Sequence, residues 1–240
     1  MRVLTWNLFH GRSQPPAGRS LLAHYTRLIA QWEWSVALLQ EVPPWFTGPL
    51  ARAAGAQSRA ALTSRSELPA ARRAIGERWP DLIKSNGGGA NVILVRDDAF
   101  VAHERARLRL LPERRVAQIA RLRSGLVLAN THLSTAVPRR GGDGRDRARD
   151  ELARLWSLAG PGPLILGGDL NLFDPVVPDG MGPVAAATHA VDHVFAVGCG
   201  ELLGTEDPAR EVQVGSRTVT LSDHHALIAE LSGVEQTNSA

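Results

Sequence analysis

Short apolar runs recur along the whole chain, either alternating with polar residues or without a polar break, and they predict β-strands. In the segment 100–111, Arg105, Arg107 and Arg109 alternate with Ala106, Leu108 and Leu110, which is typical of a strand with one face in water. The predicted strands are 2–8, 35–40, 59–63, 91–96, 100–111, 115–123, 126–130, 163–167, 193–197, 211–221 and 225–231.

Apolar residues at helical spacing occur in fewer places. Residues 21–32 show this spacing after Ser20, so we expect a helix from Ser20 to about Trp34 with Ser20 as its cap. Residues 146–158 predict a second helix, and the segments 43–54 and 68–79 favour helices too, the former broken at Gly48-Pro49. Many strands with a few separate helices predict an α+β sandwich of sheets with helices outside.

The length of 240 residues allows one sizeable core. We expect a single domain over residues 1–232 and a disordered tail over 233–240. No apolar run is long enough to cross a bilayer, and the first residues lack the zones of a signal peptide, so we expect a cytoplasmic protein. The one cysteine, Cys199, excludes an intrachain disulfide and a cysteine-based zinc cage, and we expect it to be a small buried residue.

The formal net charge is only +3, yet the pI is about 9.9. Lys84 is the only lysine, and arginine supplies the other basic side chains apart from histidine. The planar guanidinium suits phosphate recognition because it donates two hydrogen bonds at once. The arginine bias runs through the whole chain, however, so it permits a phosphate-bearing partner and does not identify one.

Candidate chemistry comes from polar residues that border apolar strands, where a rigid element fixes the direction of a side chain. A single such residue has an ordinary structural explanation, such as an Asx turn or a polar group at a sheet rim. Their recurrence at six strand ends points to one shared site. These residues are Asn7, Glu41, His132, Asp169 with Asn171, Asp192, and Asp223 with His224.

These residue types suit metal-assisted hydrolysis of a phosphate ester. Asn7, Glu41 and Asp223 offer oxygen ligands, which favour Mg²⁺ or Mn²⁺ over zinc. Either His224 or Asp169 could take a proton from the attacking water. A serine hydrolase is disfavoured because the chain has no Gly-x-Ser-x-Gly, and the glycines 87–89 lack the Gly-Lys-Ser/Thr of a P-loop.

The ordered motifs resemble the endonuclease/exonuclease/phosphatase superfamily, the DNase I-like group of Mg²⁺-dependent phosphoesterases. Gly89–Leu94 also resembles the family's turn into a central strand. The matches extend from residue 5 to residue 224 and so cover nearly the whole chain. The motifs are Thr5-Trp6-Asn7, Gln40-Glu41, Asn130-Thr131-His132-Leu133, Gly168-Asp169-Leu170-Asn171, Asp192-His193-Val194 and Ser222-Asp223-His224.

The resemblance implies a four-layer αββα sandwich in which two mainly antiparallel sheets lie face to face. It implies that Asn7, Glu41 and Asp223 bind the metal. It further implies that His132 stabilises the phosphate and that Asp169 orients or deprotonates water beside Asn171. Asp192 would orient His224, the general-base or transition-state histidine; the division of labour between Asp169 and His224 stays open.

Two positions depart from the family pattern. The family often has an aromatic residue after the aspartate that Asp192 matches, and here His193 follows. His225 is an additional imidazole after Asp223-His224, for which we expect core packing or a hydrogen bond.

The sequence gives less information about the substrate than about the fold or the reaction. Asn91, Arg139 and Arg140 are candidate substrate-binding residues, the two arginines because they lie in the loop after His132. We expect a Mg²⁺-dependent phosphodiesterase or nuclease that works as a monomer, with nucleic acid as a candidate substrate. The alternatives are an enzyme acting on a lipid head group or a small phosphorylated metabolite, and a non-catalytic binding domain with the same fold.

Overall fold

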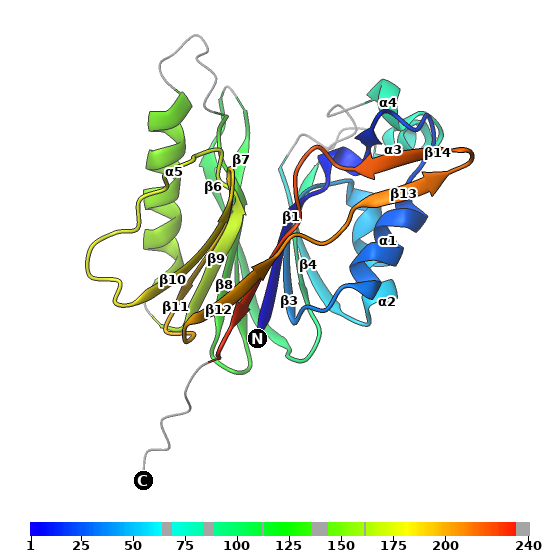
Figure 1. The fold of residues 1–240 in the computed structure, drawn as a ribbon. Helices are drawn as coiled ribbons and strands as arrows, with labels where there is room; N and C mark the ends of the chain where they lie inside the picture. Colours follow the sequence, from blue (N-terminus) through cyan, green and yellow to red (C-terminus); the bar gives the residue numbers. More distant parts are fainter. Residues whose placement is uncertain (64–68, 84–88, 112, 136–143, 161, 234–240) are drawn as a thin grey trace.

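The computed structural model describes the chain except residues 64–68, 84–88, 112, 136–143, 161 and 234–240. In this part of the chain, two six-stranded sheets lie face to face, and a small third sheet lies beside the first (Figure 1). The first sheet has the strand order β12 (Leu202–Glu206), β15 (Leu227–Leu231), β1 (Arg2–Asn7), β3 (Val36–Val42), β5 (Ala90–Val95), β4 (Gln57–Leu62). The second has the order β10 (Val184–His189), β11 (Asp192–Val197), β9 (Leu164–Asp169), β8 (Val127–His132), β7 (Arg115–Leu122), β6 (Phe100–Arg109).

Helices cover the outer faces of both large sheets. The helices α1 (Leu22–Gln31) and α2 (Thr47–Ala54) lie on the first sheet, and α5 (Gly144–Ala159) lies on the second (Figure 1). The chain also forms α3 (Pro69–Arg78), α4 (Pro80–Ile83) and the short 3₁₀ helices η1 (Phe9–Gly11) and η2 (Pro44–Phe46). The predicted four-layer αββα sandwich is confirmed.

The alternation of side chains along each strand explains the layers. Val36 and Leu38 of β3 point between the two sheets, whereas Ala37 and Leu39 point toward α1 and α2. In β9, Ile165 contributes to the inter-sheet core, and its neighbours face α5. Both strands are therefore apolar on both faces, which is why they read in the sequence as continuous hydrophobic runs.

Pairs of parallel strands occur at the centre of each large sheet and set the position of the site. β1 pairs with β3 in parallel, and β8 pairs with β9 in parallel; the other ladders of these sheets are antiparallel. Parallel neighbours place their carboxyl ends at the same edge of a sheet. The register aligns Asn7 with Gln40 and His132 with Asp169.

Several predicted boundaries were wrong. The segment 211–221 is not one strand but a hairpin of β13 (Glu211–Val214) and β14 (Arg217–Leu221), which forms the small sheet with β2 (Ser13–Gln14). Gly215 makes this turn possible because its φ of +63° is one that side-chain-bearing residues avoid. The strands β2, β10 and β12 were not predicted; they are edge or two-residue strands with weak hydrophobic patterns.

The helix predictions need two corrections. Gly48-Pro49 does not break the helix predicted over 43–54. Both residues lie in the first turn of α2, where a proline removes no intrahelical hydrogen bond. The first helix begins after Leu21 instead of Ser20, and its N-cap makes no side-chain hydrogen bond. Cys199 is fully buried as predicted. The predicted tail lies outside the described residues, apart from Gly233.

Candidate active site

Four strand ends from the two sheets converge at one end of the sandwich. Asn7 ends β1 and Glu41 lies near the end of β3, both in the first sheet. His132 ends β8 and Asp169 ends β9 in the second sheet, and β1 packs against β9. The strand-end residues that the sequence singled out therefore come together from opposite sheets.

Asp169 lies at the centre of this group and is almost completely buried. Its Oδ2 accepts a hydrogen bond of 2.9 Å from the Asn7 side-chain amide and lies 3.3 Å from Nε2 of His132. Its Oδ1 accepts a hydrogen bond of 3.1 Å from the backbone N–H of Asn171. The Asn7 oxygen accepts the backbone N–H of Phe9 at 2.9 Å, which fixes the amide so that its nitrogen faces Asp169.

His224 and Asp192 form a hydrogen-bonded pair beside Asp169. Nδ1 of His224 lies 2.9 Å from Oδ2 of Asp192, the first residue of β11, and its Nε2 lies 3.7 Å from Oδ2 of Asp169. The Ser222 hydroxyl donates to the backbone carbonyl of Asn7 and accepts the backbone N–H of His224. This serine therefore fixes the loop that carries His224 against the end of β1.

Glu41 lies on the other side of the site. One carboxylate oxygen is 3.0 Å from Nε2 of His10, and the other is 3.6 Å from Nδ1 of His132. Asp223 is exposed, and its negative charge is the second cause, after burial, of a raised pKa at Glu41, so the two carboxylates are electrostatic neighbours.

Backbone strain is concentrated in this region. Glu41, Asn171 and Ser222 have φ values of 49°, 51° and 64°, in the left-handed region that non-glycine residues rarely adopt. Phe9 and His10 share this property. Such conformations cost about 1–3 kcal/mol each and persist only where the surrounding structure imposes them.

The acidic groups of the site are difficult to ionise without a nearby cation. Burial, together with the charge of Asp192, raises the pKa of Asp169 to about 7. Burial also raises the pKa of Glu41, and the charge of Asp223 adds to the effect. A divalent cation would offset this accumulated negative charge, and the oxygen donors of Glu41, Asp223 and Asn7 fit a hard ion.

The two imidazoles that contact Asp169 differ in charge preference. Burial alone would lower the pKa of His224, but the hydrogen bond to Asp192 and the charge of Asp169 outweigh it and raise the pKa to about 9. Burial lowers the pKa of His132 well below its ordinary value, and the charge of Arg115 lowers it further. The structure thus favours a cationic His224 and a neutral His132 at neutral pH.

An open cavity of about 640 Å³ lies above these residues. Its floor contains Glu41, His132, Asp169, Asn171 and His224, so the catalytic candidates face a space that can hold a substrate. Its rim comes largely from the end of β6, the start of β7 and the residues between them, which together carry three arginines beside two exposed leucines. The other lining residues are His10, Thr63, Gly89, Arg107, Leu110, Leu111, Glu113, Arg114, Arg115 and Thr135.

Asn91, the one predicted substrate-binding residue in the described part of the chain, does not line this cavity. Asn91 is fully buried, and its side-chain amide donates to the backbone carbonyl of Val116 at 2.9 Å, which places it between strands. Arg139 and Arg140 lie outside the described residues. Asn171 lines the cavity, and its side-chain amide donates to the carbonyl of Leu133 at 3.0 Å.

Sequence reasoning missed His10 and Arg115. His10 contacts Glu41 and lies three residues after Asn7, so its proximity to a strand end was a usable signal. Arg115 is buried, lines the cavity, and has an Nε with no hydrogen-bond partner among the described residues. Nothing in the sequence separates Arg115 from the many other arginines, because only its position at the start of β7 places it in the site.

A model of the Endonuclease/Exonuclease/phosphatase family matches residues 4–224. The chain belongs to this family. Its members hydrolyse phosphoesters and generally depend on a divalent metal, so the protein is a phosphoester hydrolase. The sequence-based family assignment is confirmed. No curated protein sequence matches the chain.

Solved structures of family members share the fold. An endonuclease/exonuclease/phosphatase from Beutenbergia cavernae has 18% identity and a TM-score of 0.66, with 95% of this chain and 70% of that chain covered. TDP2 from Caenorhabditis elegans has 18% identity and a TM-score of 0.62, with 95% and 73% covered. A mannosyl-6-phosphatase from Bacteroides thetaiotaomicron has 14% identity and a TM-score of 0.66, with 96% and 98% covered. At such identities the likeness shows the fold alone.

A membrane-spanning helix is not present among the residues that the structure describes, since none of their helices is both long and apolar enough.

Proposed function

We propose that this family member is a Mg²⁺-dependent hydrolase that cleaves a phosphodiester by attack of water on phosphorus. The observation that carries the proposal is the environment of Asp169, whose carboxylate is within 4 Å of the side chains of Asn7, His132 and His224. Asp169, His132 and His224 thus share the floor of one cavity, and the buried Asn7 amide lies directly beside Asp169.

Glu41, Asp223 and Asn7 would hold the metal ion, and Mn²⁺ could replace Mg²⁺. When bound, the ion would polarise a phosphoryl oxygen and offset charge on the leaving group. Asn7 retains an acceptor site for this role, because an amide oxygen has two lone pairs and Phe9 uses one.

Asp169 is our candidate for the group that orients the attacking water and takes its proton. His224 is flanked by Asp192 and Asp169, and two negative neighbours favour its protonated form. In that form it can donate a hydrogen bond from Nε2 to the phosphate while Nδ1 donates to Asp192. His132 and Asn171 would donate further hydrogen bonds to the transition state. The Nε of Arg115, which has no partner among the described residues, would donate to a substrate phosphate.

The arginines at the cavity rim favour a nucleic acid as the first substrate to test. Arg107, Arg114 and Arg115 line the side of the cavity formed by the end of β6, the start of β7 and the residues between them. Several guanidinium groups near one reacting phosphate can contact neighbouring phosphates of a polymer, which a monoester lacks.

A second candidate is a small phosphorylated metabolite or a lipid head group. The cavity volume of about 640 Å³ favours it, since sites for small molecules fall in the range of about 300–1,000 Å³. The structural neighbour described as a mannosyl-6-phosphatase adds weight to a sugar phosphate within this class.

A substrate panel tests the proposal. Purified protein is offered plasmid DNA, single-stranded DNA, RNA, phosphoinositides, sugar phosphates and an aryl phosphodiester, each with Mg²⁺ or EDTA. Asp169→Asn and His224→Ala are measured in parallel, with Asp146→Asn and His24→Ala as matched controls on α5 and α1. We expect Mg²⁺-dependent turnover of a phosphodiester in the wild type and in both controls, and a loss of about 10²-fold or more in the two site variants.

Turnover confined to monoesters would select the second candidate. Equal turnover in the wild type and both site variants would contradict the assigned roles, and absence of turnover on the whole panel would contradict the phosphodiester proposal.

A further inference from the structure

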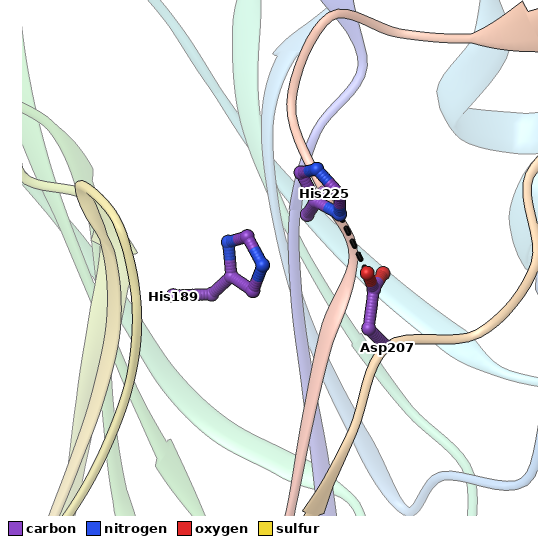
Figure 2. A group of neighbouring side chains, drawn as sticks. All are labelled: His189, Asp207 and His225. Atoms are coloured by element: carbon purple, nitrogen blue, oxygen red, sulfur yellow. Dashed lines mark hydrogen bonds and ion pairs between the residues drawn. The ribbon is translucent and has the colours of Figure 1, made fainter.

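A second group of metal-binding side chains lies on the edge of the sandwich, outside the cavity. His189 ends β10 of the second sheet, Asp207 follows β12 of the first sheet, and His225 precedes β15 (Figure 2). Each side chain offers one ligand atom, and these atoms all lie within 4.8 Å of one another. Figure 2 shows the His189 ring and the Asp207 carboxylate both directed toward His225.

Hydrogen bonds among the residues that the structure describes do not satisfy this group. Nδ1 of His225 lies 2.5 Å from Oδ2 of Asp207 and 3.2 Å from Nη2 of Arg210. One ring nitrogen can donate to the carboxylate or accept from the guanidinium, but it cannot do both. The His189 ring stacks on His225 with centroids 4.1 Å apart, and its buried Nδ1 has no partner among the described residues.

We propose that His189, Asp207 and His225 form a second metal site, which takes Zn²⁺ or a similar borderline divalent ion such as Co²⁺ or Ni²⁺. Two imidazoles and one carboxylate are a donor set that favours these ions over Mg²⁺, and water would complete the coordination. The active-site ligands, by contrast, are all oxygen donors. The two sites therefore differ in the class of ion that they select.

Ion binding requires small local movements. With bonds of about 2.0–2.1 Å to nitrogen and oxygen, the short contact between His225 and Asp207 must open and the His189 ring must approach. His225 and Asp207 are exposed and His189 is half-buried, so no core packing opposes these rotations. Arg210 remains a partner for the other carboxylate oxygen, from which its Nε lies 4.0 Å away, and such outer partners commonly orient metal-binding carboxylates.

The location gives the ion a structural role. It would join the edge strand of one sheet to that of the other, where β10 already contacts β12 and β15. His189 pairs with Asp192 across the β10–β11 ladder, and His225 directly follows His224. The ion would therefore clamp the two segments that position the His224–Asp192 pair, without touching the reacting groups.

Zinc binding to metal-stripped protein tests this proposal. Binding is measured by equilibrium dialysis and by competition with a chelating dye, in excess Mg²⁺ so that the active site prefers its own ion. We compare the wild type with His189→Ala and Asp207→Asn, with His24→Ala as a control histidine, and with Glu41→Gln as a variant of the other site. Circular dichroism confirms that each variant is folded.

We expect the wild type, His24→Ala and Glu41→Gln each to bind one Zn²⁺ tightly. His189→Ala and Asp207→Asn should bind it at least about tenfold more weakly, since even outer-shell partners contribute about 10–100-fold to metal affinity. Zn²⁺ should also raise the melting temperature of the wild type and leave that of Asp207→Asn unchanged. Retention of the tight Zn²⁺ by both edge variants, or its loss in Glu41→Gln alone, would overturn the proposal. Absence of tight Zn²⁺ binding in the wild type would also overturn the proposal. The hydrogen bond between His225 and Asp207 would then be the only role assigned to this group.

Discussion

Asp192 illustrates how one carboxylate can act through its neighbour. It is almost completely buried, and one of its oxygens binds His224 at 2.9 Å, while the other has no hydrogen-bond partner among the described residues. We therefore propose that it acts on the reaction through the orientation and charge of the imidazole, since His224 lies between it and Asp169.

We predict that Asp192→Asn lowers kcat by about 10²–10⁴-fold and changes KM much less, because a misoriented or wrongly protonated His224 affects the transition state more than ground-state binding. Steady-state kinetics on the best substrate of the panel measure this effect. The matched control is the exposed Asp146→Asn, which should keep the wild-type kcat. If kcat fell by the same factor in the control as in Asp192→Asn, the loss would be a general effect of charge and not an effect on His224.

His193 replaces the aromatic residue that the family often has at this position, and the structure explains how an imidazole fits. Its Nε2 lies 2.7 Å from the carbonyl of Leu172, its Nδ1 lies 3.0 Å from the Thr188 hydroxyl, and its ring stacks parallel to Phe195. Burial lowers the pKa of His193, so the folded protein holds it neutral.

This lowered pKa predicts a pH dependence of stability. Below pH of about 6.5 the unfolded chain binds a proton at this residue that the folded chain does not, so the free energy of unfolding falls as the pH falls. His193→Phe should flatten this slope below a pH of about 6.5. At pH 7 the variant should be less stable by about 1–3 kcal/mol, because Leu172 loses its hydrogen-bond donor. Urea titrations at several pH values test both effects, and equal slopes would contradict the first.

At the scale of elements, the close approach of β8 and β9 fixes the spacing of His132 and Asp169. Gly168 pairs with Thr131 just before these two residues and has a φ of +137°. A Cβ at residue 168 would lie only 2.0 Å from the carbonyl oxygen of Thr131. A glycine is therefore required here for both space and backbone conformation.

Gly168→Ala should destabilise the protein by about 2–5 kcal/mol, from the sum of backbone strain and steric overlap. It should also reduce activity, since the displaced strand end carries Asp169. Gly204→Ala is the control, because Gly204 of β12 has ordinary φ and no atom within 4 Å of an added Cβ. Thermal unfolding and kinetics of both variants are the measurements; similar melting temperatures would contradict the argument.

At the scale of the whole molecule, the active site joins two sheets that meet through apolar side chains and through buried amides such as Gln40 and Asn130, which are hydrogen-bonded at 2.9 Å. Asn7 and Glu41 come from the first sheet, whereas His132 and Asp169 come from the second. The carboxylate of Asp169 is buried and that of Glu41 is half-buried, both lie near His132, and burial raises the pKa of both. An ion held by Glu41, Asp223 and Asn7 would offset this negative charge and should therefore stabilise the folded protein.

We expect Mg²⁺ to raise the melting temperature of the wild type. At a concentration 100 times the Kd, the stabilisation should be about 2.7 kcal/mol. Glu41→Gln should abolish most of this Mg²⁺ effect because it removes a charged ligand. Thermal scans with Mg²⁺ and with EDTA measure this shift, and the ionic strength of the two samples is matched with NaCl to remove non-specific salt effects. An equal Mg²⁺ shift in both proteins would contradict the assigned ligand.

The sequence by itself determined the layers and the list of strand-end candidates. Two-residue alternation and continuous apolar runs depend only on local side-chain order, and they already predicted strands such as β3 and β9. The family motifs added the αββα arrangement. The roles assigned to Asn7, Glu41, Asp223 and the other site residues stay predictions, although the fold brings most of them together.

Only the tertiary structure decided which side chains meet. The register of β8 with β9 and the packing of β1 on β9 place Asp169 against Asn7 and His132, and the start of β7 makes Arg115 part of the cavity. The same is true of His225, for which the sequence left core packing or a hydrogen bond open: it is exposed and contacts Asp207, next to His189. Contacts between residues far apart in the chain depend on strand order and register, and no local pattern of side chains contains that information.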